Sequence, residues 1–112
     1  MDIVDQIGTR SRFSCPECGG VLWEVEQQPA RFRCHIGHAF GAETLVDSQQ
    51  AEIEFGLHKL LRSHREHVAL LRRAAERVSP AVAEILNERA SGYESDAATI
   101  ERLLAKQPVK AE

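Results

Sequence analysis

The distribution of apolar and polar residues changes character near residue 42 and divides the chain into two parts. Before this point, short stretches rich in β-forming residues lie between turn-forming glycine, glutamine and proline residues. After it, glycine is nearly absent until Gly92, and apolar residues recur at spacings of three and four, which is typical of amphipathic helices. The pattern therefore predicts a small β-rich unit followed by helices.

The first part contains three short extended pieces, at residues 12–14, 21–25 and 31–33. Gly19-Gly20 separates the first two pieces, and Gln27-Gln28-Pro29 separates the last two. Glycine and proline in these positions favour reversals of the chain. We expect an antiparallel sheet of two or three strands.

The second part predicts a first helix over about residues 42–78 and a second over about 80–107. Ser79 is a preferred N-cap residue, and Pro80 suits the first helical position. Neither helix can bury its apolar stripe alone, so an antiparallel hairpin is the simplest arrangement, with a single kinked helix paired to another chain as the alternative. The join is very short, so we expect the first helix to give up its last residues to the turn. The expected stripes are Leu45, Ile53, Leu57, Leu60, Leu61, Val68, Leu71, Ala75 and Val78 in the first helix, and Val82, Ile85, Leu86, Tyr93, Ala97, Ile100, Leu103 and Leu104 in the second.

Candidate chemistry is concentrated in four residues of the first part: Cys15, Cys18, Cys34 and His38. Their spacing is Cys-x2-Cys, fifteen residues, then Cys-x3-His. Soft and borderline ligands in such pairs are typical of tetrahedral structural zinc sites. Adjacent residues rarely converge on one ion, so His38 is predicted as the fourth ligand in preference to His35. The sequence therefore predicts one structural Zn²⁺ per chain.

The cysteine count and the turn glycines agree with this interpretation. The chain has three cysteines, an odd number, and all of them lie between residues 15 and 34. A secreted disulfide framework favours an even count, so the clustering indicates a shared ligand and a reducing compartment. Gly19 and Gly37 allow the tight turns that bring both ligand pairs to one ion. The alternative is three buried cysteines and two unrelated histidines.

The zinc interpretation completes the expected organisation, which is a small α+β fold. We expect a lead-in over residues 1–11, a zinc ribbon over 12–41, a helical hairpin over 42–107 and a tail over 108–112. Four protein ligands close the coordination sphere and leave no position for a reacting water, so no catalytic residue and no enzyme activity are expected.

Charge argues against a nucleic-acid partner. The chain has 14 basic and 17 acidic residues, a net charge of −3, and no strongly basic segment. Phosphate-backbone binding depends on a local excess of lysine and arginine. The alternative is a nucleic-acid-binding zinc ribbon in which Trp23 and Phe32 stack on bases and Arg31, Arg33 and a basic cluster at residues 72–77 share one face. We expect instead that the two rings form the ribbon core.

Targeting signals are also absent from the sequence pattern. No stretch of about 18 apolar residues occurs, and the first residues lack a basic region followed by an apolar core. We expect a cytoplasmic protein with no membrane partner and no small-molecule substrate.

Two stretches of the first part resemble a known family. Residues 14–24 (Ser-Cys-Pro-Glu-Cys-Gly-Gly-Val-Leu-Trp-Glu) and 31–40 (Arg-Phe-Arg-Cys-His-Ile-Gly-His-Ala-Phe) resemble a C-terminal extension of some CheB-type chemotaxis protein-glutamate methylesterases. The chain departs from that pattern at His58 and His64, where a tryptophan and a leucine are expected. The likeness continues through Glu54, Leu57, Leu61, Arg62, Glu66, Leu70, Arg72, Arg73 and Glu76.

The resemblance implies an accessory module without esterase activity. The family's hydrolase uses a Ser–His–Asp triad on a separate α/β domain, and only 14 residues precede Cys15 in this chain. We therefore expect the catalytic domain to be absent. The resulting hypothesis is a zinc-binding protein-interaction module accessory to bacterial chemotaxis-type signalling. Adjacent pairs such as Leu60-Leu61 and Leu103-Leu104 exceed what one hairpin can cover, so we expect a homodimer through the helices.

Overall fold

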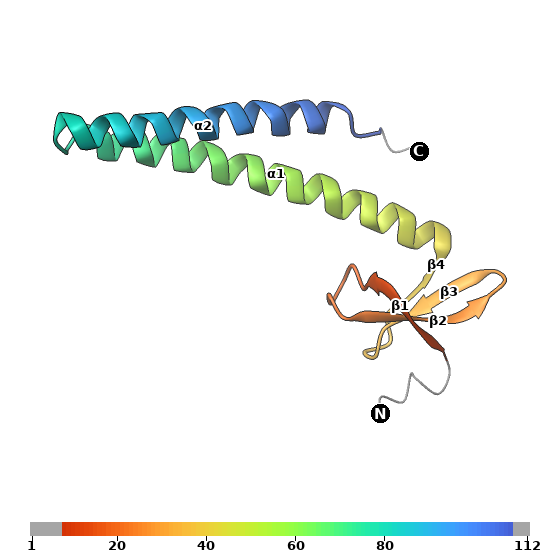
Figure 1. The fold of residues 1–112 in the computed structure, drawn as a ribbon. Coiled ribbons are helices and arrows are strands. Elements are labelled where there is room, and N and C mark those ends of the chain that lie inside the picture. The colour runs from red at the N-terminus through yellow and green to blue at the C-terminus, as the bar shows by residue number, and fades with distance from the viewer. Residues whose placement is uncertain (1–7, 109–112) are drawn as a thin grey trace. The chain divides into compact units, whose positions relative to one another are not determined.

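The computed structural model describes residues 8–108 and shows a small sheet followed by two helices (Figure 1). Residues 1–7 of the expected lead-in and 109–112 of the expected tail lie outside the described residues. The predicted α+β fold is confirmed. The elements are β1 (Thr9–Ser14), β2 (Val21–Gln27), β3 (Ala30–Arg33), β4 (Ala39–Gly41), α1 (Ala42–Ala75) and α2 (Pro80–Ala105).

The sheet is an antiparallel meander with strand order β1-β2-β3-β4. The sequence predicted two or three strands, and the sheet has four, because β4 returns along β3 and places Phe40 opposite Phe32. A strand of three residues is too short for a period of two to be recognised in the sequence. β1 also begins at Thr9, earlier than the expected Arg12, and pairs with β2 from its first residue.

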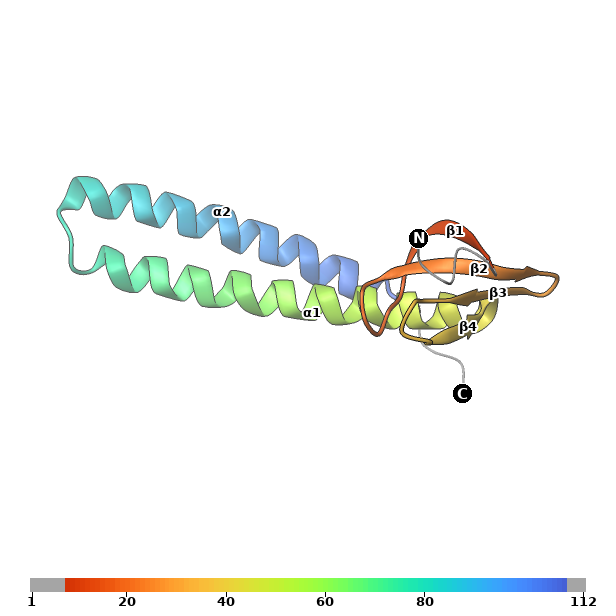
Figure 2. The ribbon, with the colours of Figure 1, turned by 90° about the horizontal axis from the view of Figure 1, so that it is seen from below.

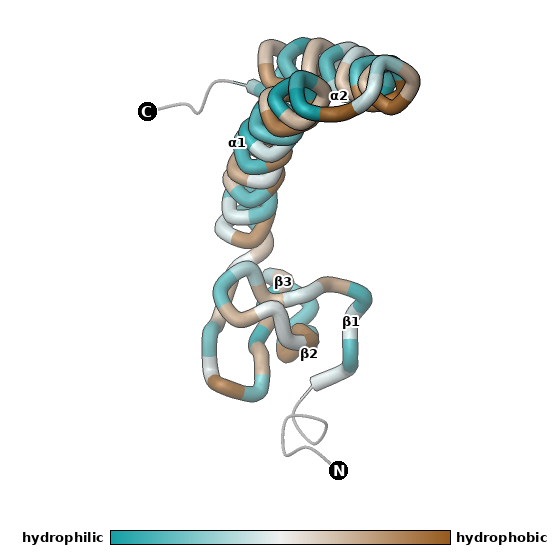
Figure 3. The backbone as a smooth tube through the Cα atoms, turned by 90° about the vertical axis from the view of Figure 1, so that its left-hand side faces the viewer, coloured by the Kyte–Doolittle hydropathy of each residue, from teal (hydrophilic) through white to brown (hydrophobic). Residues whose placement is uncertain are grey.

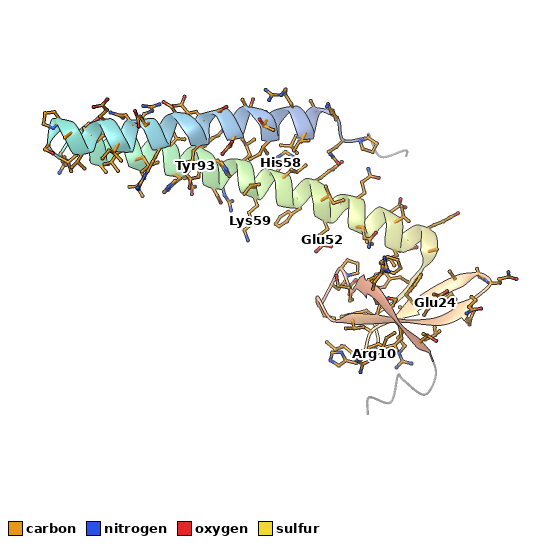
Figure 4. The ribbon with its side chains drawn as sticks, in the orientation of Figure 1. Arg10, Glu24, Glu52, His58, Lys59 and Tyr93 are labelled. Atoms are coloured by element: carbon orange, nitrogen blue, oxygen red, sulfur yellow. The ribbon has the colours of Figure 1, made fainter. Side chains whose placement is uncertain are left out.

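One face of the sheet carries the core of the ribbon. Leu22, Phe32 and Phe40 are buried there together with Cys15 and Cys34. Successive side chains of a strand point to opposite faces. Trp23 therefore lies on the other face from Leu22, where it is 3% exposed and the guanidinium carbon of Arg10 lies 5.5 Å from its ring centre. Figure 4 labels Arg10 on β1.

The first turns of α1 belong with this core. Leu45 is 5% exposed and packs in the same cluster as Phe32 and Phe40. The chain accordingly divides into two compact units, residues 1–52 and 53–112, and the boundary falls inside α1. The sequence placed Leu45 in the helical stripe, because periodicity shows which face of a helix is apolar and not what that face contacts.

The second unit is a helical hairpin in which α1 and α2 lie side by side (Figures 1 and 2). α1 ends at Ala75, and residues 76–79 make the turn, as expected for so short a join. The side chain of Ser79 accepts a hydrogen bond from the Val82 N–H at 3.4 Å, and Pro80 occupies the first helical position. The predicted cap of the second helix is confirmed. Figure 3 shows apolar and hydrophilic bands alternating along both helices.

The contact between the helices follows a seven-residue repeat. In residues 53–75 of α1, the buried and half-buried side chains recur at alternating spacings of three and four. The same spacing recurs in α2, where Tyr93 occupies one of the positions although it is 37% exposed. Such a repeat is typical of coiled-coil packing. We call these positions the seam. It comprises Glu54, Leu57, Leu61, His64, Val68, Leu71 and Ala75 on α1, and Ala83, Leu86, Ala90, Tyr93, Ala97, Ile100 and Leu104 on α2.

One side of the seam is held by polar contacts between the helices. Arg65 Nη2 donates to Glu101 Oε1 at 2.5 Å, and Arg72 Nε donates to Glu94 Oε1 at 3.0 Å. Arg72 Nη1 also donates to the side-chain oxygen of Asn87 at 3.4 Å. Each of these residues lies four positions after a seam residue of its own helix. We call this side the ion-paired edge.

On the opposite side of the seam lie eight residues, four on each helix. Each of them comes one position before a seam residue, and they recur every seven residues. All eight of them are exposed. The sequence pattern grouped four of them, Ile53, Leu60, Val82 and Leu103, with the seam, because periodicity alone cannot separate adjacent apolar residues. We call this side the open edge. It comprises Ile53, Leu60, His67 and Ala74 on α1, and Val82, Arg89, Asp96 and Leu103 on α2.

Within residues 8–108, neither helix contains a segment long and apolar enough to cross a membrane.

Candidate metal centre

The first pair of cysteines lies in the turn between β1 and β2. The Gly19 N–H donates to the Cys15 carbonyl at 2.8 Å, and the Cys15 N–H donates to the Gly20 carbonyl at 2.6 Å. Gly19 has a φ of +76°, a conformation that side-chain-bearing residues rarely adopt. The turn therefore folds back on itself within a few residues, which brings Cys18 to the side of Cys15.

The second ligand pair lies in the turn between β3 and β4 and repeats this design. The Cys34 N–H donates to the His38 carbonyl at 3.0 Å, and the Gly37 N–H donates to the Cys34 carbonyl at 3.2 Å. Gly37 has a φ of +113°. Both glycines that the sequence singled out thus adopt positive φ, and each of them sits in a ligand loop.

The four predicted ligands converge. The ligand atoms of Cys15, Cys18, Cys34 and His38 all lie within 4.8 Å of one another. His38 Nδ1 is 3.5 Å from Cys15 Sγ and 3.4 Å from Cys34 Sγ. Zinc–sulfur and zinc–nitrogen bonds of about 2.3 Å and 2.0–2.1 Å in a tetrahedron require a nitrogen–sulfur separation of about 3.5 Å. This group could therefore hold a tetrahedral metal ion.

The site is closed on one side and open on the other. Cys15 and Cys34 are 2% and 0% exposed, because they form part of the ribbon core. Cys18 is exposed and His38 is half-buried. A metal ion in this position would join two strand-connecting turns to the apolar interior. It would thus compensate for a core of only a few large side chains.

Glu17 contacts the outer side of the candidate ligand His38. Its Oε2 lies 3.1 Å from His38 Nε2, while Nδ1 faces the sulfurs. This geometry assigns the ring proton to Nε2, which donates to the carboxylate, and leaves the Nδ1 lone pair for a metal. Carboxylate–histidine–metal arrangements of this kind fix the tautomer and orient the ring.

Sequence reasoning did not identify Glu17 as part of the site. Its side chain is 62% exposed, and a glutamate between two ligands resembles any other surface charge. The one signal in the sequence was its position inside the ligand loop, because a residue next to Cys18 stays close to the ion. Which carboxylate reaches the histidine depends on how the two turns face each other.

The sulfurs differ in their affinity for protons. Burial raises the pKa of the Cys34 thiol, but the backbone N–H groups of His38, Gly37 and Ile36 stabilise the thiolate and lower the pKa to about 6. At Cys18, the Gly20 N–H favours the thiolate, but desolvation and the neighbouring Cys15 and Cys34 outweigh it and raise the pKa. Clustered thiolates repel one another, and a divalent cation removes that cost.

The remaining candidates lie outside the ligand group. His35 is exposed, and its ring lies beside Gly20, 3.6 Å from where a Cβ at that glycine would be. Trp23 and Phe32 are 3% and 7% exposed, so the two rings offer no free face on which a base could stack. Phe32 belongs to the core cluster, as expected, whereas Trp23 is buried on the other face of the sheet, beside Arg10.

A second group of ring side chains lies on the hairpin. The rings of His64 and His67 lie 5.3 Å and 4.6 Å from the ring of Tyr93, which Figure 4 labels on α2. His64 Nδ1 is also 3.0 Å from the Leu60 carbonyl. Among residues 8–108, Cys15, Cys18, Cys34 and His38 form the one group with metal-binding geometry. The helix histidines therefore pack on Tyr93 and do not form a second centre.

Comparison of the chain with protein-family models, curated proteins and solved structures gives no match in any of the three. The resemblance to the methylesterase extension therefore rests on the residues of the sequence alone.

Proposed function

We propose that this chain is a non-enzymatic module that binds one structural zinc ion and acts by binding protein. The observation that carries the metal proposal is the convergence of three cysteine sulfurs and one imidazole nitrogen within 4.8 Å. The nitrogen–sulfur distances of 3.4 and 3.5 Å match a tetrahedral zinc site.

The donor set favours zinc among the common metals. Thiolates with an imidazole select zinc over calcium and magnesium, which prefer oxygen ligands. Four protein ligands fill a tetrahedral sphere, so the proposed ion is structural and has no position for a reacting water. Its role is to hold the two ligand turns together and so stabilise a sheet with a small apolar core.

The hairpin is the proposed protein-binding part. Its open edge exposes apolar side chains, whereas Arg65 and Arg72 on the other edge are engaged by Glu101 and Glu94. Arg72 belongs to the basic cluster of the nucleic-acid alternative, and its contact with Glu94 makes it less available for phosphates. The resemblance to the methylesterase extension suggests an accessory role in chemotaxis-type bacterial signalling, in the cytoplasm.

The proposal can be tested on the full chain by elemental analysis and by exchange with Co²⁺. We expect one zinc per chain, and a cobalt spectrum that reports tetrahedral thiolate coordination. His38→Ala should weaken metal binding strongly, whereas His35→Ala, a matched change three residues away, should not. A folded sample without metal, or the reverse order of the two variants, would overturn the assignment.

A salt series with duplex and single-stranded DNA separates the two functional hypotheses. A nucleic-acid binder loses affinity steeply as salt rises, because binding releases counterions. We expect no binding at physiological salt. Micromolar binding that Arg72→Glu together with Arg73→Glu abolishes would replace the proposed function with the nucleic-acid alternative.

A further inference from the structure

The α2 half of the open edge is complementary to itself when its direction is reversed. Val82, Arg89, Asp96 and Leu103 follow one another at intervals of seven residues, so they lie in one row about 10.5 Å apart. The row is apolar at both ends and charged in the middle. A rotation of the row by 180° about an axis near Gly92 brings the valine position onto the leucine position and the arginine position onto the aspartate position.

The members of this row are available to a partner. Val82 and Leu103 are 44% and 42% exposed, and Ile85, beside Val82 on the same side of α2, is 51% exposed. Arg89 and Asp96 are exposed, and within the described part of the chain their side chains form no ion pair or hydrogen bond. By contrast, charged residues of the ion-paired edge are matched within the chain.

We propose that the open edge binds a second copy of this chain, with the two α2 helices antiparallel about a two-fold axis near Gly92. Isologous interfaces of this kind require a surface that complements itself. The two-fold places Arg89 against the partner's Asp96, and Val82 against the partner's Leu103, twice each. This inference rests on the proposed protein-binding function and names its partner.

A parallel pairing of two copies in register does not satisfy the charges. A parallel arrangement in register places Arg89 against the partner's Arg89 and Asp96 against the partner's Asp96. Like charges opposite one another are destabilising, whereas opposite charges set partner choice and orientation in coiled coils. The charge pattern therefore favours the antiparallel arrangement over the parallel one in register.

The size of the surface suits a stable dimer. α2 has 26 residues and is about 39 Å long, and two packed helices present a face about 20 Å wide. The resulting area is on the order of 800 Å² per chain, which is that of a standard protein–protein interface. Leu60 and Ile53, which are 46% and 55% exposed on α1, lie on the same edge and extend its apolar part.

Gly92 provides an independent indication at the proposed axis. A glycine inside an exposed helix destabilises it by a measurable amount relative to alanine. Nothing lies within 4 Å of a Cβ built at Gly92, so no packing among residues 8–108 requires a glycine there. Glycine at a helix contact lets two backbones approach closely. In the proposed dimer, a second α2 passes close to Gly92, and the glycine allows the two backbones to approach.

Charge reversal on the intact zinc-loaded chain tests the proposal. We expect sedimentation equilibrium to show a dimer for the unchanged chain. Arg89→Glu alone and Asp96→Arg alone should each weaken dimerisation about tenfold or more, because each creates two like-charge contacts. The two single variants mixed together should form a heterodimer, and the double variant Arg89→Glu with Asp96→Arg should restore the homodimer.

Matched controls use charges on the outer face of α2. Glu88→Arg and Arg102→Glu make equivalent reversals away from the open edge and should leave the dimer unchanged. Gly92→Leu should raise the helix content and the melting temperature of the monomer while weakening the dimer, two effects that a folding defect cannot produce together.

The outcomes are distinguishable from a failure of the metal proposal. Metal content is measured on the same samples, so a zinc-loaded monomer at tens of micromolar would overturn the dimer and leave the metal centre intact. A dimer unaffected by both single reversals would show that the two copies meet elsewhere and would also overturn this inference. Failure of the mixed variants to associate would exclude the antiparallel pairing.

Discussion

The two units of this chain bury their apolar residues in different arrangements. The ribbon gathers Leu22, Phe32, Phe40 and Leu45 into one cluster around two of its candidate ligands, while Phe13 and Ile36 stay exposed. The hairpin buries small and large residues along one line, including two alanines of α2, and leaves other leucines exposed. In the functions proposed above, an ion completes the interior of the ribbon, and a second copy of the chain covers the open edge of the hairpin.

Because of this difference, substitutions in the two units should have different effects. A substitution in a ligand turn should act through the ion and affect the ribbon as a whole. A substitution in the seam should act through local packing and destabilise the hairpin in proportion to the apolar volume that is removed.

The largest effect is expected when a buried ligand is removed. Cys34→Ser should abolish metal binding and unfold the sheet, because structural zinc contributes on the order of 10 kcal/mol in small modules. Backbone amide signals of the sheet should collapse in NMR spectra, while those of residues 80–105 persist. His35→Ala is the control, since this exposed neighbour lies outside the ligand group. Retention of the metal by Cys34→Ser would contradict the assigned ligand set.

Truncating an apolar side chain of the seam should have a smaller effect on stability, and this effect should be confined to the hairpin. Leu61 is 7% exposed and packs with Ala97 and Ile100. Leu61→Ala should lower the free energy of unfolding of the hairpin by about 2–4 kcal/mol, through reduced transfer energy and an unfilled cavity. Phe55→Ala, on a 70% exposed residue of the same helix, should change it by less than about 0.5 kcal/mol.

Denaturant titration followed by circular dichroism measures this change, and the metal content of Leu61→Ala should stay at one ion per chain. Loss of the metal from this variant would show that the units do not respond separately.

Removing the charge behind the histidine should weaken the metal site without destroying it. Glu17→Gln should lower zinc affinity about 10- to 100-fold, because the amide no longer fixes the protonated Nε2 of His38 as strongly. Competition with a chelating dye measures the affinity. Glu26→Gln, an exposed change on β2, should leave it unaltered. An unchanged affinity in Glu17→Gln would mean that the 3.1 Å contact does not orient the ring.

The smallest effect is expected at the turn of the hairpin. Ser79→Ala removes the side-chain acceptor of the Val82 N–H and should destabilise α2 by about 1 kcal/mol. Ser91→Ala, in the middle of the same helix, should be neutral or slightly stabilising, since alanine is the better helix former. Thermal melting of both variants measures the difference. Equal melting temperatures would argue that the cap bond contributes nothing.

Features set by chemistry within a few residues were predictable from the sequence. The ligand pairs with their turn glycines and the Ser79-Pro80 start of α2 each depend on local conformational preferences. The spacing of the cysteines also indicated that the two turns must meet. His35 directly follows Cys34, and adjacent residues rarely converge on one ion, so the sequence could place His38 among the candidate ligands in preference to His35.

Features that depend on how elements face one another were not predictable. Leu60 and Leu61 are equally apolar, and only the path of α2 makes one of them exposed and the other buried. The contact of Glu17 with His38 depends in the same way on the relative position of two turns. β4 was missed because it exists by pairing with β3 and has little pattern of its own.

The turn at residues 76–79 also has a consequence for the order of folding. Contacts across the seam grow more distant in sequence away from the turn, from 22 residues for Arg72 and Glu94 to 36 for Arg65 and Glu101. Because closing longer loops costs more entropy, contacts between the two helices should form first beside the turn and then progressively farther from it. Substitutions near Val82 should then slow folding, whereas those near Leu104 should mainly speed unfolding.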